Sequence, residues 1–176
     1  HPIEELKSLN NVAFVDFEWI TDRVYLVGIS DGIDYRAFWA DSLKDEDVDK
    51  MWLLVVDYLR NKTIIYWYAE KSKFMKDCPY PLDCEWFDLC QAFRNSTAIK
   101  GSMDFKLKNI ARAFYNLGHM PYYIDSFECQ NGEQSIDIAL SYYENRDESQ
   151  KMSIEKYNRF DCEAMYFIAK KLKTFD

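Results

Sequence analysis

The chain has 176 residues, of which 48% are hydrophobic and 17% aromatic, and this is enough to bury one sizeable core. Its formal net charge of −8 argues against a general nucleic-acid coat protein, which would be basic. No apolar run approaches the roughly 20 residues that a membrane-spanning helix needs, and no segment resembles a signal peptide. We therefore expect one domain over residues 1–176, with no membrane association.

The five cysteines are an odd number without the close pairs of a zinc finger or zinc ribbon. Together with the missing secretion signal, this predicts free thiols in a reducing intracellular compartment, the cytoplasm or the nucleus. A cluster that uses Cys78, Cys84 and Cys90 is the alternative. Because the chain begins with His1-Pro2 and not with an initiator Met, we expect a domain excised or trimmed from a larger protein.

The first third of the chain predicts a β-meander followed by a helix. Three segments rich in Val, Ile, Phe, Tyr and Trp are broken by Thr21-Asp22 and Asp31-Gly32 turns, so we expect strands over residues 12–19, 23–30 and 34–40. Apolar residues then recur at helical spacing, which predicts a helix from about Asp45 to Asn61.

The rest of the chain predicts one buried strand and then helices. Residues 63–68 form an uninterrupted apolar run, which is typical of a strand inside a mixed sheet. A short helix is expected from Glu70 to Asp77. Further helices are expected at about 87–93, 105–117, 133–145 and 153–174, the last with Ser153 as its N-cap. This order indicates an α/β fold with a mixed sheet and a helical second half.

Two short motifs, one near each end of the chain, carry the chemistry. In the first strand, Asp16 and Glu18 stand at i and i+2 and project from the same face. In the last helix, Tyr157 and Asp161 stand at i and i+4 and also share a face. If these three acids and the phenol converge on one point, they form an oxygen-rich site that suits Mg²⁺ or Mn²⁺. Such a site points to metal-dependent phosphodiester cleavage. The alternative is that Asp16 and Glu18 are merely solvated at the exposed end of the strand.

The segment between Arg94 and His119 is basic, since Asp104 is its only acid. We predict that it contacts a phosphate backbone. The alternative is a solvated helix face. The candidate nucleic-acid-binding residues are Lys100, Lys106, Lys108 and Arg112.

The order of these motifs resembles the DEDD exonuclease superfamily, whose fold is ribonuclease H-like. The Tyr157-x-x-x-Asp161 spacing matches its tyrosine subclass, DEDDy. In pattern the chain is most similar to predicted exonuclease domains called ribonuclease H-like or RecB-family nuclease-like, which are sometimes fused to helicases. The likeness covers nearly the whole chain and rests on five segments in the expected order: Asp16-Phe-Glu18, Tyr66-Trp-Tyr-Ala-Glu70, Phe87-Asp88-Leu89, Asp104-Phe-Lys-Leu-Lys108 and Tyr157-Asn158-Arg-Phe-Asp161.

The second of these segments, Tyr66-Trp-Tyr-Ala-Glu70, which we call the middle segment, departs most from the family pattern. The family's His is Trp67 here, and the stretch before the acid is shorter. The resemblance places the third acid just after the buried strand, at Glu70, whereas the alternative is a solvated acid in the first turn of a helix. Asp88 is a second candidate ligand, or else an N-terminal helix cap.

The resemblance implies a two-metal-ion 3′–5′ exonuclease acting on DNA or RNA, with single-stranded ends as substrate and a helicase or other nucleic-acid enzyme as a fused or separate partner. Asp16 would bridge two Mg²⁺ or Mn²⁺ ions, Glu18 and Asp161 would each complete the shell of one ion, and Glu70 would be the third acid. Tyr157 would position the attacking water. The degenerate middle segment favours an alternative, a catalytically inactive module that binds nucleic acid or a partner protein.

Overall fold

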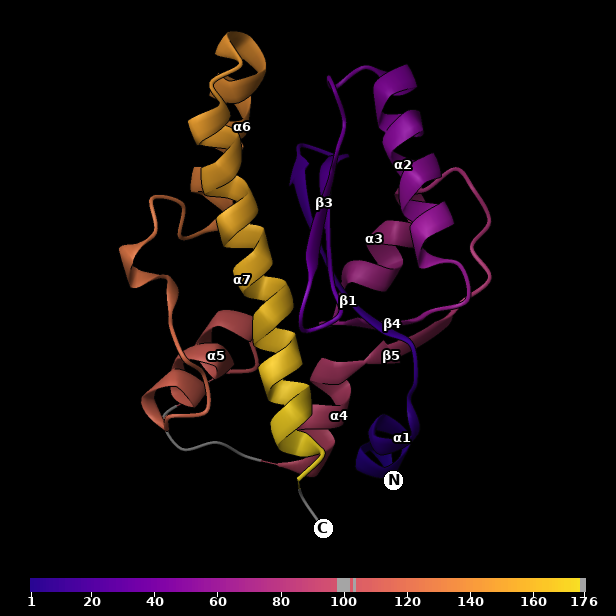
Figure 1. The fold of residues 1–176 in the computed structure, drawn as a ribbon, viewed down its shortest axis with the longest axis vertical. Coiled ribbons are helices and arrows are strands. Elements are labelled where there is room, and N and C mark those ends of the chain that lie inside the picture. The colour runs from indigo at the N-terminus through magenta and orange to yellow at the C-terminus, as the bar shows by residue number, and fades with distance from the viewer. Residues whose placement is uncertain (98–101, 103, 175–176) are drawn as a thin grey trace.

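The computed structural model of the chain describes residues 1–97, 102 and 104–174. These residues form a five-stranded mixed sheet in the order β3-β2-β1-β4-β5 (Figure 1). The first three strands pair antiparallel as a meander, whereas β4 runs parallel to β1 and β5 runs parallel to β4. The predicted α/β class with a mixed sheet is confirmed. The strands are β1 (Val12–Ile20), β2 (Arg23–Ser30), β3 (Tyr35–Trp39), β4 (Thr63–Tyr66) and β5 (Glu85–Asp88).

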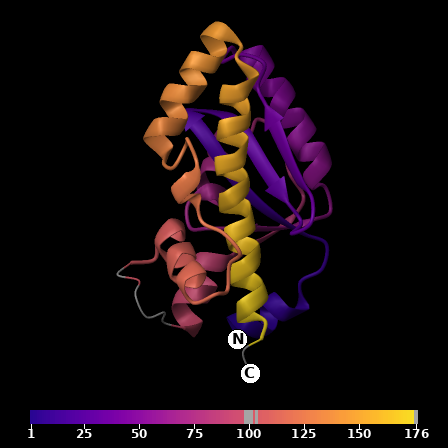
Figure 2. The same ribbon diagram turned by 60° about the vertical axis from the view of Figure 1, so that its left-hand side comes forward.

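Helices cover both faces of this sheet. They are α1 (Pro2–Ser8), α2 (Asp45–Leu59), α3 (Glu70–Asp77), α4 (Leu89–Ser96), α5 (Leu107–Asn116), α6 (Gly132–Asn145) and α7 (Glu148–Leu172), with a short 3-10 helix, η1, at Ile124–Ser126. One face carries α2 and α3, and the long helix α7 crosses the other face, where α4, α5 and α6 also lie (Figures 1 and 2). In the described part of the chain, no helix is long and apolar enough to cross a membrane.

The central strand β1 is buried on both sides, and its alternation decides where its acids point. Val15 and Phe17 pack on the α2 and α3 side, whereas Phe14 packs on the α7 side. Because alternate side chains of a strand share a face, Asp16 and Glu18 follow Phe14 and project towards α7. The sequence pattern thus places two carboxylates beneath the longest helix.

Three elements of the described chain were not predicted. They are helix α1 before the first strand, the edge strand β5, which pairs parallel with β4, and the short 3-10 helix η1. The predicted helix at 87–93 is therefore displaced, because residues 85–88 are strand and α4 begins at Leu89. A strand of four residues is too short for a period-2 pattern to distinguish it from a helix start.

Two predicted boundaries are also wrong. Helix α7 begins at Glu148, because the Asp147 carboxylate accepts a hydrogen bond from the Ser149 N–H (2.9 Å) and caps the helix six residues before Ser153. The strand expected over 63–68 ends at Tyr66. The remaining predicted elements agree with the structure within a few residues.

Gly28 of β2 leaves room for a side chain of α7. It pairs with Asp16 across the β1–β2 ladder, and a Cβ at this position would lie 1.5 Å from the side-chain oxygen of Asn158. Only a residue without a side chain allows the Asn158 amide to approach the sheet here.

We expect Gly28→Ala to lower the free energy of unfolding by about 1–3 kcal/mol, because the added methyl displaces the buried Asn158 amide. Urea denaturation measures this, with Gly132→Ala as the control, since nothing lies within 4 Å of a Cβ at Gly132. Equal stability of Gly28→Ala and the wild type would show that Asn158 moves aside without loss.

Candidate metal centre

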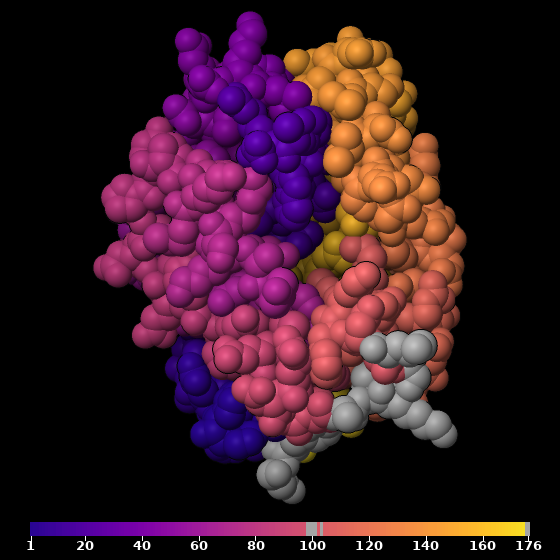
Figure 3. Space-filling view, turned by 180° about the vertical axis from the view of Figure 1, so that it is seen from behind, coloured from indigo at the N-terminus to yellow at the C-terminus, as the bar shows by residue number. Residues whose placement is uncertain are grey.

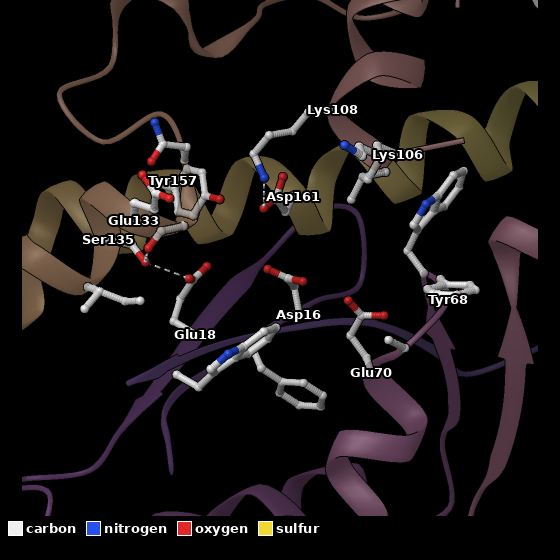
Figure 4. A pocket seen from close by; sticks show the side chains of 18 residues that line it. Asp16, Glu18, Tyr68, Glu70, Lys106, Lys108, Glu133, Ser135, Tyr157 and Asp161 are labelled. Carbon is white, nitrogen blue, oxygen red and sulfur yellow. Dashed lines mark hydrogen bonds and ion pairs between the residues drawn. The ribbon is translucent and has the colours of Figure 1, made fainter. Parts of the chain in front are cut away.

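The site lies where α7 crosses β1. Asp16 and Glu18 come from the strand and Asp161 comes from the helix, and one carboxylate oxygen of each lies within 4.8 Å of those of the other two. All three side chains are buried. Figure 4 shows Asp16 between Glu18 and Glu70, with Asp161 facing it from α7. Three convergent carboxylates match the oxygen ligands that Mg²⁺ and Mn²⁺ prefer.

Neighbouring polar side chains fix the orientation of these acids. The Asn158 amide donates hydrogen bonds to Asp16 Oδ2 (3.2 Å) and to Glu18 Oε1 (3.4 Å), while its oxygen accepts one from the Tyr35 hydroxyl (2.8 Å). The Ser135 hydroxyl of α6 donates to Glu18 Oε2 (3.0 Å). Partners that hold ligand side chains in this way define the geometry of a metal site as much as the ligands do.

The cluster is electrostatically strained because its charges are buried together. Burial and then the Asp161, Glu18 and Glu70 carboxylates raise the pKa of Asp16 well above its usual value. Burial, followed by repulsion from Asp161, raises the pKa of Glu18 to about 8. A divalent cation among the three acids would offset both burial and repulsion, so the residues present fit a metal ion.

One lysine offsets part of this charge. Lys108 of α5 donates to Asp161 Oδ2 (2.9 Å), and its ammonium lies 4.5 Å from the centre of the Tyr157 ring. Burial raises the pKa of Asp161, and the Lys108 ammonium opposes the rise. The other oxygen of Asp161, Oδ1, is buried and has no hydrogen-bond partner among the described residues, so it is available to a cation.

Tyr157 lies beside the acids, one helical turn before Asp161. Burial and the Asp161 carboxylate raise the pKa of its phenol far above the usual value, although Lys108 acts in the opposite direction. The hydroxyl therefore stays protonated at neutral pH and can act as a hydrogen-bond donor, but not as a free base.

Glu70 and Asp88, the two candidates for the third acid, are placed very differently. Glu70 begins α3, lines the same pocket as the three clustered acids and has a buried oxygen, Oε2, without a hydrogen-bond partner among the described residues. Burial raises its pKa to about 7, and Asp161 adds to the rise, although backbone N–H groups at the start of α3 oppose it. Asp88 instead caps α4 by accepting from the Gln91 N–H (2.9 Å) and does not line this pocket.

The acids lie in an open hollow of about 710 Å³. Figure 3 shows it between the indigo β1 region and the orange α6 region, with yellow α7 at its base. Among the predicted phosphate-binding residues, Lys106 and Lys108 line the hollow. Arg112 instead forms a two-pronged ion pair with Asp125 (2.7 and 3.1 Å), and Lys100 lies outside the described residues.

Two contributors to the site were not predicted from the sequence. Asn158 sits three residues before Asp161, so its position on the same helix face was available as a signal. Ser135 comes from a different helix, and no local pattern links it to Glu18. The inward direction of Lys108 also depends on how α5 packs, which the sequence pattern does not specify.

A family model of the RNase_H superfamily matches residues 13–173. The chain belongs to this superfamily. The match runs from β1 to the end of α7 and so includes every strand and every acid of the site. It confirms the predicted ribonuclease H-like fold and supports nuclease chemistry.

Comparison with curated proteins gives no match. Among solved structures, this RNase H superfamily chain is similar to one titled "Crystal structure of EXD2 exonuclease domain soaked in Mn and GMP". The two share 15% sequence identity, with 98% of this chain and 86% of that chain covered, and the TM-score is 0.35. A TM-score this low transfers neither residues nor activity from one chain to the other.

The raised carboxylate pKa values predict that the metal-free protein loses stability as pH rises. For Glu18 the pKa is about 8 in the folded chain against 4.5 ordinarily, so between these values the folded state binds more protons than the unfolded state. The free energy of unfolding therefore falls as pH increases through this window. We expect Tm in EDTA to drop between about pH 5 and pH 8, and Mn²⁺ to raise Tm more at the higher pH.

Thermal melts of the wild type and Glu18→Gln measure this slope, with the exposed Glu46→Gln as the control. Glu18→Gln should flatten the pH dependence, and Glu46→Gln should leave it as in the wild type. A wild-type Tm that rises over the same interval in EDTA would contradict the electrostatic account.

Proposed function

We propose that this chain is a metal-dependent nuclease that hydrolyses phosphodiester bonds at nucleic-acid ends, in the manner of the tyrosine subclass of DEDD 3′–5′ exonucleases. The observation that carries the proposal is the buried group of Asp16, Glu18 and Asp161, whose ligand atoms lie within 4.8 Å of one another. Burying these acids without a cation is unfavourable, so a functional reason must keep them together.

Four carboxylates would hold the metal. Asp16, Glu18, Asp161 and Glu70 would bind two divalent ions, Mg²⁺ or Mn²⁺, which when bound supply Lewis acidity to the scissile phosphate. Glu70 belongs to this set because its unpartnered oxygen lies in the same pocket and because its pKa responds to the charge of Asp161. Glu70 begins α3, a few residues after the end of β4, the strand that pairs parallel with β1.

The remaining residues position the reactants. The protonated Tyr157 hydroxyl orients the attacking water by a hydrogen bond. Lys108 holds Asp161 and Tyr157 in place through its ion pair and its contact with the ring. Lys106, exposed at the edge of the pocket, supplies a positive charge for a substrate phosphate that would otherwise be repelled by an acidic protein.

The first test is hydrolysis of single-stranded DNA and RNA with Mg²⁺ or Mn²⁺. Cleavage should stop in EDTA, and Asp16→Ala and Asp161→Ala should each lower turnover by at least about a hundredfold, because either change disassembles a metal site. The exposed Asp57→Ala on α2 is the control and should retain wild-type turnover. Cleavage that persists in EDTA contradicts the metal mechanism, and tight binding without any cleavage would favour a non-catalytic module.

A second comparison tests whether Glu70 or Asp88 is the further metal-binding acid beside Asp16, Glu18 and Asp161. Glu70→Gln should reduce turnover more than Asp88→Asn, because Glu70 lines the acid pocket whereas the Asp88 carboxylate is used as a helix cap. Asp88→Asn should lower the free energy of unfolding by at most about 1 kcal/mol, since Asn also caps helices. An inactive Asp88→Asn beside a fully active Glu70→Gln would reverse the assignment.

A further inference from the structure

Tyr68 has a conformation that the fold itself does not explain. It follows the end of β4, its side chain is 70% exposed, and its φ of +68° lies in the left-handed region. A residue other than glycine adopts this region at a cost in free energy. Because the exposed ring buries little surface, a glycine would serve the fold better at this position.

The residues on either side hold the Tyr68 backbone in place. Trp67 is buried, and its indole N–H donates to the Phe105 carbonyl (2.9 Å). On the other side, the Ala69 N–H donates to the Trp67 carbonyl (3.0 Å), and α3 begins at Glu70. The turn is therefore fixed at both ends, and Figure 4 shows the Tyr68 ring on the Glu70 side of the acid pocket.

Tyr68 is shared by two hollows. It lines the acid pocket together with Asp16 and Glu70, and it also lines a second hollow of about 430 Å³. Besides Tyr68, the second hollow is lined by Arg94, Gln91, Asn95, Cys90 and Asp88, the residue that caps α4. A strand end with one phosphate at the acids and the next part of its backbone near Arg94 would cross the Tyr68 ring.

We propose that Tyr68 is a stacking platform for a nucleobase at the substrate end held by the acid pocket. The inference rests on the proposed function, and it adds a substrate contact that neither the acid motifs nor the family match assigns. An exposed aromatic ring beside a phosphate site is suited to this role, because every base has a face that stacks on it. Strain in the Tyr68 backbone is then retained because it presents the ring to the substrate.

The test is binding of single-stranded DNA and RNA whose 3′-terminal base is 2-aminopurine, a fluorophore that is quenched on stacking. The protein is the full chain with Ca²⁺ in place of Mg²⁺, and gels verify that the strand stays intact. The wild type and Tyr68→Phe should quench the fluorophore, whereas Tyr68→Ala should quench little and bind roughly ten- to a hundredfold more weakly. Tyr115→Ala, which removes an exposed ring that lines neither hollow, should behave as the wild type.

A strand that ends in an abasic nucleotide separates stacking from general damage. It should bind the wild type and Tyr68→Ala equally, because no base is present to stack. Quenching by Tyr68→Ala, or failure of every strand to quench with the wild type, would overturn the proposal. Quenching in Ca²⁺ without hydrolysis in Mn²⁺ would instead support Tyr68 and refute the proposed nuclease activity.

The backbone strain gives an independent measurement. Tyr68→Gly should have a Tm at least as high as the wild type while losing the quench, because it removes both the strain and the ring. Thr21→Gly, a change at another exposed residue with positive φ (+58°), should preserve the quench. A large fall in Tm for Tyr68→Gly would show that the ring serves the fold, and would overturn the proposal.

Discussion

The structure depends on one unfavourable arrangement, the burial of like charges where α7 crosses β1. Asp16 and Glu18 lie beneath α7, which carries Asp161 and covers much of the apolar core, so the three acids cannot separate without moving that helix. Burial and mutual repulsion act in the same direction on the two strand acids and favour their protonated forms. The fold therefore buries uncompensated negative charge at its centre, where a divalent cation would be bound favourably.

Several features of the chain serve to tolerate this arrangement. Gly28 leaves space for Asn158, whose amide donates hydrogen bonds to both acids of β1. The Ser135 hydroxyl donates a further hydrogen bond to Glu18 Oε2. Lys108 neutralises part of the charge of Asp161 and leaves its second oxygen free of protein partners among the described residues. The acids are thus held in fixed orientations, but their negative charge is not fully neutralised by protein groups. This is the condition expected of a ligand-binding site.

The sequence predicted those parts of the site that depend on local spacing. Asp16 with Glu18, and Tyr157 with Asp161, share faces because a strand repeats every two residues and a helix every 3.6. The position of Glu70 followed from its place after a buried strand. The mixed sheet followed from alternating and continuous apolar runs, although β5 was too short to recognise.

The parts that could not be predicted depend on contacts between distant segments. Ser135 reaches Glu18 only because α6 packs beside α7, and Lys108 turns towards Asp161 only because of the way α5 packs against α7. Arg112 was expected to contact a substrate phosphate, but in the structure it forms an ion pair with Asp125. The left-handed backbone conformation of Tyr68 likewise could not be predicted, because the apolar run over residues 63–68 is typical of a continuous strand.

Anomalous diffraction from crystals grown with Mn²⁺ shows whether the acids at the β1–α7 crossing bind divalent metal. We expect a Mn²⁺ peak within coordination distance of Asp16 and Asp161 that is lost in Asp161→Asn crystals. Saturating Mn²⁺ with no peak among these acids, or peaks confined to surface carboxylates, would contradict it.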